Sequence, residues 1–266
     1  MPAMDDQYLQ IWREHARGLG LAEPAIDRWL RLARPQLALH KVTDDPAAAD
    51  APIVGYRGGH PFLPPDIEWS GAPDFIASID CAALPSNLPG FPLPKDGHLL
   101  FFHYVEWGGV ESQYPEGDGQ VLYIPAGTAT SERIITANRH PEVEPAERFP
   151  LQCSLYWDPT HGCCGPIPDI FDQLTALEDP RPAYVRNMDV EMLVGGYCFT
   201  ETSGPCDLAE YSDPEHKKWR QLAHMERDLS DHGEPLPFFV RWVIREDDLA
   251  EQRFDRVQTH IEDRFA

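Results

Sequence analysis

FIASID at residues 75–80 and HLLFFHY at residues 98–104 are the two stretches of sequence that decide the fold class. In the first stretch the side chains alternate with a period of two, which is the period of a β-strand. The second stretch is a continuous apolar and aromatic run of strand length, as expected for a largely buried strand. A polar, proline-containing stretch separates them, so we predict two strands joined by a turn region.

Similar patterns occur further along the chain. Residues 121–124 form a short apolar run closed by turn residues, and a late strand is predicted at residues 238–244. Residues 222–244 also repeat the order of the first pair, which is a strand, a turn region and an aromatic-rich strand. We therefore predict a duplicated hairpin unit, in which the strands beginning at Phe75 and Leu222 occupy related positions.

Helical periodicity is found near both ends of the chain. Apolar residues recur at helical spacing across residues 8–19 and across residues 26–37, so two helices are predicted there. A third helix is predicted to start at Asp248, which has Glu251 three residues later, as in a capping box. Its buried face is expected to carry four apolar residues, namely Phe254, Val257, Ile261 and Phe265.

These patterns predict an α+β fold: a mostly antiparallel β-sheet with duplicated hairpin units, N-terminal helices and a C-terminal helix. A helical segment at residues 1–40 is expected to pack on a main α+β domain at residues 41–266. Residues 137–183 are rich in proline and show little periodicity, so we expect long ordered loops there.

The chain is strongly acidic. It has 44 Asp and Glu against 22 Lys and Arg, a net charge of −22, and the whole excess lies after residue 40. Such a surface repels phosphate backbones and anionic lipids, so neither nucleic-acid nor membrane binding is predicted. The same surface would attract a basic protein partner. The oligomeric state does not follow from the sequence.

The sequence predicts a soluble cytoplasmic protein. No basic segment followed by an apolar stretch opens the chain, and no apolar run approaches the length of a membrane span. The six cysteines are sparse for 266 residues and do not resemble a secreted disulfide framework, so reduced thiols are expected.

Motifs that would identify a catalytic activity are missing from the sequence. It contains neither GxSxG nor SxxK, and its glycine doublets lack the frames that bind phosphate. Tight turns are expected at these doublets, which are Gly58-Gly59, Gly108-Gly109 and Gly195-Gly196. We therefore predict no catalytic residue and no cofactor.

A group of cysteines raises the question of a metal site. Its members are His161, Cys163, Cys164, Cys198 and Cys206. Zinc sites pair their ligands two to four residues apart, whereas two of these cysteines are adjacent and the other two are widely spaced. Buried structural thiols are therefore expected and no structural metal is predicted, although the sequence does not decide the matter.

Two pairs of polar residues are candidates for binding a small ligand. Ser78 with Asp80, and His224 with Glu226, stand two residues apart, so each pair lies on one face of its strand. The alternative is a hydrogen-bonded pair in a half-buried strand. An iron site at the second pair would need another histidine that the sequence does not place.

Two tryptophans are candidates for anchoring a protein partner. Trp107 and Trp157 are expected in irregular loops beside Glu106 and Asp158, where a basic rim could pair with the acids while an indole fills a pocket. The alternative is that both rings are buried in the domain.

A series of short motifs lies in a fixed order along the chain. They begin with RGGHPFLP at residues 57–64 and continue to Trp69, and the later ones lie at residues 75–80, 97–102, 121–125, 195–197, 239, 244–249 and 254–257. In this order the motifs resemble the YwqG-like family, known mainly as a domain of unknown function. The resemblance covers roughly residues 26–262.

The resemblance implies a single α+β domain built from two β-hairpin halves, each with a Gln-x-Asp pair. Those pairs fall at the two polar pairs of this chain, and only Asp80 matches the family residue. A Gly-Asp-x-Gly stretch of the family is replaced at residues 233–237, and its Pro after Gly-Tyr is Cys198 here. No activity is established for the family, and some members are thought to lie beside toxin genes as immunity or accessory proteins.

Two function classes remain open at this point, and the sequence favours the first. The first is a protein-binding module of inhibitor or immunity type, whose acidic surface meets a basic partner. The second is a small-ligand-binding protein or enzyme that uses the polar pairs together with Arg57 and Trp69.

Overall fold

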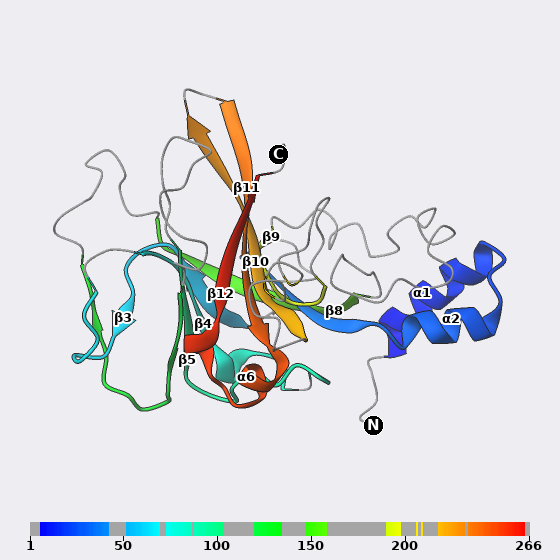
Figure 1. Ribbon diagram of the computed structural model, residues 1–266, viewed down its shortest axis with the longest axis horizontal. Coiled ribbons are helices and arrows are strands. Elements are labelled where there is room, and N and C mark those ends of the chain that lie inside the picture. Colours follow the sequence, from blue (N-terminus) through cyan, green and yellow to red (C-terminus); the bar gives the residue numbers. More distant parts are fainter. Residues whose placement is uncertain are drawn as a thin grey trace.

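A strongly curled antiparallel β-sheet forms the centre of the computed structural model (Figure 1). The structure describes residues 6–42, 52–69, 73–86, 88–103, 120–134, 147–158, 190–197, 206, 209, 218–231 and 234–263. Within these ranges the large sheet has ten strands in the order β12-β11-β10-β9-β1-β8-β2-β4-β5-β6, and β3 pairs with β7 in a separate ribbon. Each neighbouring pair is antiparallel, as predicted from the sequence.

The strands differ considerably in length. The strands of the large sheet are β1 (Arg34–Lys41), β2 (Ile53–Arg57), β4 (Asp74–Asp80), β5 (His98–His103), β6 (Gln120–Ile124), β8 (Phe149–Asp158), β9 (Val190–Gly195), β10 (Trp219–Asp231), β11 (Glu234–Arg245) and β12 (Gln258–Asp263). The short ribbon contains β3 (Phe62–Leu63) and β7 (Ser131–Glu132), and two 3₁₀ turns are η1 (Cys81–Ala83) and η2 (Phe254–Arg256).

Both predicted hairpins are present, as β4 with β5 and as β10 with β11. β4 lies third from one edge of the sheet and β10 lies third from the other, and each pairs with its own aromatic-rich strand. That the two units are duplicates of each other stays a prediction. The curl of the sheet brings the hairpins together, since the rings of Phe101 on β5 and Trp242 on β11 meet edge to face at 5.3 Å.

The helices α1 (Asp6–Gly18) and α2 (Glu23–Leu30) lie at one end of the sheet (Figure 1). α1 confirms the first predicted helix. The second helix ends earlier than predicted, because Pro35 disfavours a helical conformation at the residue before it and the chain enters β1 instead. The apolar faces of both helices pack with one residue of β8 in a cluster of Leu9, Trp12, Ala16, Ala25, Ile26, Trp29, Leu30 and Trp157.

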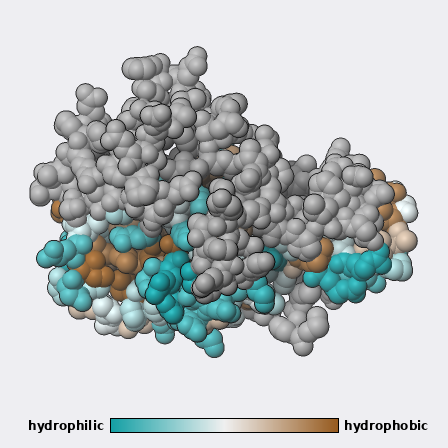
Figure 2. Space-filling view, in the orientation of Figure 1, coloured by the Kyte–Doolittle hydropathy of each residue, from teal (hydrophilic) through white to brown (hydrophobic). Residues whose placement is uncertain are grey.

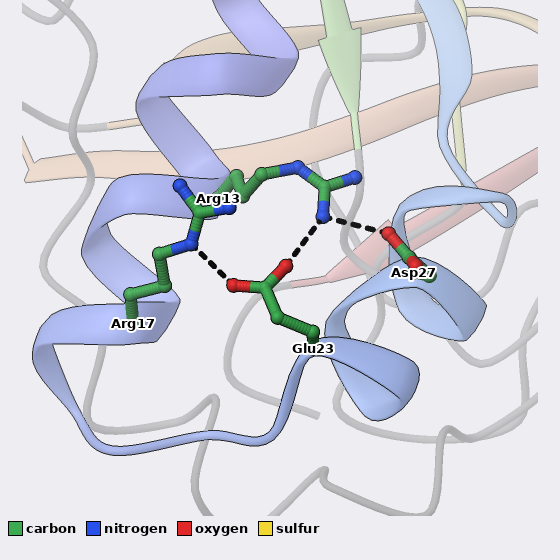
Figure 3. Close-up of polar contacts among 4 residues, drawn as sticks. All are labelled: Arg13, Arg17, Glu23 and Asp27. Atoms are coloured by element: carbon green, nitrogen blue, oxygen red, sulfur yellow. Dashed lines mark hydrogen bonds and ion pairs between the residues drawn. The ribbon is translucent and has the colours of Figure 1, made fainter.

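A group of ion pairs also joins α1 to α2 (Figure 3). Nη1 of Arg13 lies 2.9 Å from Oε2 of Glu23 and 2.6 Å from Oδ1 of Asp27, and Arg17 binds the other oxygen of Glu23. Hydrogen bonds from Arg17 and then from Arg13 hold the pKa of Glu23 below its usual value. About half of each of the side chains of Arg17, Glu23 and Asp27 is accessible to water, so the apolar cluster contributes more than the ion pairs to fixing the helices.

The predicted C-terminal helix is wrong over most of its length. α6 (Glu246–Ala250) has five residues, its N-cap is Arg245 rather than Asp248, and the chain then runs through η2 into β12. Val257 and Ile261 stand four residues apart, a spacing that fits one face of a helix and one face of a strand equally well. Because β12 pairs with β11, this stretch forms a strand and not a helix.

The expectation of loops across residues 137–183 is also wrong in part, because β8 lies inside that range and pairs with β1 and β2 near the middle of the sheet. Residues 159–183, like Phe265, lie outside the described part of the chain. Among the helices that the structure describes, none is both long enough and apolar enough to cross a membrane.

Candidate functional site

A pocket of about 420 Å³ opens on the outer face of the strands β2, β4 and β5, away from the main core. Its polar lining includes Ser78 and Asp80 from β4 and His98 from β5, and Arg148 closes one side. The β3–β7 ribbon covers this face, and Figure 2 shows hydrophobic side chains gathered on the side of the molecule where β3 lies.

Strand alternation explains why these side chains converge. Tyr56 on β2 lies opposite Ser78 on β4, and Asp80 lies opposite His98 on β5, so all four side chains point to the outer face. The spacing of two residues thus puts both side chains of the first predicted polar pair on one face of β4, where they line the pocket.

The floor of the pocket is apolar. Phe75, Leu100 and Ile124 line it and belong to a cluster beneath the ribbon that also contains Phe102. Trp69 belongs to the same cluster, with its ring 6.0 Å from that of Phe102, and its Nε1 donates to the carbonyl of Pro73 at 2.8 Å. Trp69 therefore packs in the apolar cluster beside the pocket and does not line it.

The turn after β2 carries the chain over the pocket. Gly58 and Gly59 both have positive φ, at 71° and 72°, which confirms the tight turn predicted for this doublet. Gly58 N–H donates to the carbonyl of Ile76 at 2.9 Å. A Cβ on Gly59 would lie 2.8 Å from Cβ of Arg148, so this glycine leaves the space in which the arginine stem packs.

Two charged groups face the pocket from different elements. Oδ1 of Asp80 accepts a hydrogen bond from N–H of Ala82 at 3.0 Å, which caps η1 and fixes the carboxylate. The guanidinium carbon of Arg148 lies 4.0 Å from the ring centroid of Tyr56 and 5.5 Å from that of Phe62. The pocket therefore combines one carboxylate, one guanidinium and two aromatic faces.

Comparison with known families gives one match. The family model described as "Domain of unknown function (DUF1963)" matches residues 57–262, which is well over half of the chain. The chain belongs to this family. No curated protein matches it.

Arg57 of this DUF1963 member lies on the opposite side of β2 from the pocket. It forms an ion pair with the buried carboxylate of Glu191 on β9, which also binds Nζ of Lys41 at 2.9 Å. Arg57 therefore does not join Ser78 and Asp80 as expected. This triad could not be found from the sequence, because its members come from three strands that are far apart along the chain.

The second polar pair of the DUF1963 fold does not share the pocket. His224 and Glu226 lie on β10, and four strands separate β10 from β4 in the sheet. The ring of His224 lies 6.1 Å from that of Phe239, and burial, followed by the charge of Arg241, lowers the pKa of His224 to about 3. Its imidazole is therefore neutral at physiological pH, while Glu226 is exposed.

Neither tryptophan is placed as a surface anchor in the described part of the chain. Trp157 lies on β8 rather than in a loop and is only 5% exposed, because α1 and α2 cover it. Trp107 lies outside the described residues. The ring of Trp157 is therefore buried in the domain, which is the alternative to a surface anchor that the sequence left open.

Most of the cysteine group also lies outside the described residues, namely His161, Cys163, Cys164 and Cys198. Cys206 is buried in an apolar cluster with Trp219. No group of three potential metal ligands is found within the described ranges.

The structure describes two further cysteines, Cys81 and Cys153. Burial, with a smaller effect of Asp80, raises the pKa of Cys81 to about 12, and burial alone raises the pKa of Cys153 to about 12. Both thiols are therefore protonated at neutral pH.

Proposed function

We propose that this chain binds a small polar molecule in the pocket formed by β2, β4 and β5. The observation that carries the proposal is the convergence of Ser78, Asp80 and Arg148 on one concave site with an apolar floor. Known ligand sites combine such a floor with a few placed polar groups, and their volumes begin at roughly 300 Å³. The pocket has the size of a metabolite site rather than of a protein interface.

The resemblance to the YwqG-like proteins supports the same pocket. It places one of the family's Gln-x-Asp pairs at Ser78 and Asp80, and Asp80 is the residue that matches. The carboxylate is therefore the feature of the pocket that a shared ligand would use. No reaction is proposed, because no described side chain has the arrangement of an activated nucleophile.

A tryptophan at the rim should abolish binding. Thr130 is exposed and lines the pocket, so Thr130→Trp places an indole across the entrance. We expect equilibrium dialysis against a cell metabolite extract, read by mass spectrometry, to show a compound retained by the natural protein. Retention should fall roughly tenfold or more in the variant, a difference of about 1.4 kcal/mol in binding free energy.

Thr128→Trp is the matched control, since Thr128 is an exposed residue of the same loop that does not line the pocket. It should leave retention unchanged. Retention that is equal in both variants would place the ligand elsewhere, and the absence of any retained compound would remove the support for a small-molecule function.

A basic protein partner is the second candidate. The net charge of −22 favours it, as do three exposed apolar side chains around the same face, Ile53, Tyr56 and Phe62. Such a partner would make the chain an inhibitor or immunity-type module. Association should weaken steeply between low and high salt, which pull-down from lysate at two ionic strengths would measure. Binding that does not depend on salt would contradict the electrostatic mechanism.

A further inference from the structure

The charges that line the pocket point to one class of ligand. Among its described lining residues, Asp80 is the only carboxylate and Arg148 is the only lysine or arginine. We propose that the ligand is a zwitterion of amino-acid size, with its ammonium group at Asp80 and its carboxylate at Arg148. This inference rests on the proposed function and specifies the molecule that the same pocket selects.

Asp80 has a free oxygen for an ammonium group. One of its oxygens is engaged by N–H of Ala82, and within the described part of the chain the other, Oδ2, has no hydrogen-bond partner. Ser78 lies on the same face two residues away, and its hydroxyl supplies a further acceptor. An ammonium group has three donors, which this pair of side chains can share.

Arg148 is arranged to bind a carboxylate. Its guanidinium lies against the rings of Tyr56 and Phe62, and within the described residues it has no acidic partner. Stacking occupies the faces of a guanidinium, whereas its N–H groups lie in the plane and remain able to bind a carboxylate in a bidentate manner. The aromatic contacts therefore orient the group without using its donors.

The two charges are separated by a distance that one small molecule can span. Tyr56, under the guanidinium, is the cross-strand neighbour of Ser78, and Asp80 is two residues further along β4. Strand geometry puts the backbone positions of Tyr56 and Asp80 roughly 8 Å apart, a distance that a molecule of amino-acid size can span with a hydrogen bond at each end. The apolar floor between them suits the side chain of an apolar or aromatic amino acid.

The charge of the whole protein favours the same class. At a net charge of −22, the field of the protein repels a ligand that is only an anion. A ligand that is only a cation would leave the donors of Arg148 unused. A zwitterion carries no net charge and satisfies both groups, so it is selected over molecules that carry either charge alone.

Three probes test this assignment: L-phenylalanine, N-acetyl-L-phenylalanine, which lacks the ammonium charge, and L-phenylalaninamide, which lacks the carboxylate. Titrations followed by ligand-observed NMR should show L-phenylalanine binding about tenfold more tightly than either blocked probe, as expected for one charged hydrogen bond. Asp80→Asn should remove the preference over the N-acetyl probe. Arg148→Met should remove the preference over the amide. The asparagine retains an oxygen that can cap η1.

Asp66→Asn and Lys95→Met are the controls, because they make the same changes of net charge at exposed positions outside the pocket. Both should leave the ratios of affinity unchanged. Equal affinity for the three probes, or no binding of L-phenylalanine, would overturn the inference. If the dialysis experiment then retains a compound without paired amine and carboxylate, the pocket stands as a ligand site and the zwitterion assignment falls. If it retains nothing, both fall.

Discussion

Trp242→Ala is expected to lower the free energy of unfolding by about 4 kcal/mol, in the range of buried tryptophan truncations. The side chain of Trp242 is fully buried. Its ring contacts Phe101 at 5.3 Å and His103 at 6.4 Å, and Nε1 donates to the carbonyl of Phe102 at 3.2 Å. Because these residues lie on β5 and Trp242 lies on β11, the indole joins the two hairpins across the interior of the curled sheet.

Urea denaturation followed by circular dichroism measures this loss. Trp242→Phe keeps a ring but loses the hydrogen bond, so its loss should be clearly smaller. Ile134→Ala is the control, since the side chain is 64% exposed and its truncation should change stability by no more than about 0.5 kcal/mol. A loss below about 1 kcal/mol for Trp242→Ala would contradict the contact between the two hairpins.

His224 is expected to make the fold sensitive to acid. Burial, followed by the charge of Arg241, lowers the pKa of His224 from 6.5 to about 3 in the folded state. The unfolded chain therefore binds more protons between these two values, so stability should fall as the pH is lowered from about 6.5 towards 3. At about 1.4 kcal/mol per pKa unit, and with part of the ring accessible to water, we expect a loss on the order of 3 kcal/mol.

The comparison of interest is between the natural protein and His224→Gln, which cannot gain this proton. Arg241 and His260 lie beside this position on β11 and β12, and both are present in the natural protein and in the variant. Denaturation at pH 7 and pH 4 should show that the natural protein loses more unfolding free energy on acidification than His224→Gln does. The control His98→Gln, at an exposed position, should lose as much as the natural protein. An identical pH dependence with and without His224 would show that its ring is not the group responsible.

Strand β4 could be predicted because most of its side chains alternate between two environments. From Ala77 to Asp80 they point in turn to the main core and to the pocket, and the bulge between Phe75 and Ala77 interrupts this period. The central strands β1 and β8 were missed because polar residues are buried inside them. Gln36, His40 and Gln152 are all buried, with at most 8% of any of them exposed, so the alternation of apolar and polar residues no longer reports which face is covered.

The candidate site was only partly predictable for a related reason. The spacing of Ser78 and Asp80 along one strand is local, so the sequence could place both on one face. Arg148 reaches Tyr56 only because β8 pairs with β2, a contact across about ninety residues that depends on the topology of the whole sheet. Nothing in the residues around Arg148 distinguishes it from the other arginines of the chain.

The position of a bound ligand tests the central claim most directly. A crystal structure of the protein soaked with the compound retained in dialysis should show it between Asp80 and Arg148, above the floor formed by Leu100. Density for the compound at any other place on the molecule, with the pocket holding only solvent, would contradict the assignment of this pocket as the functional site.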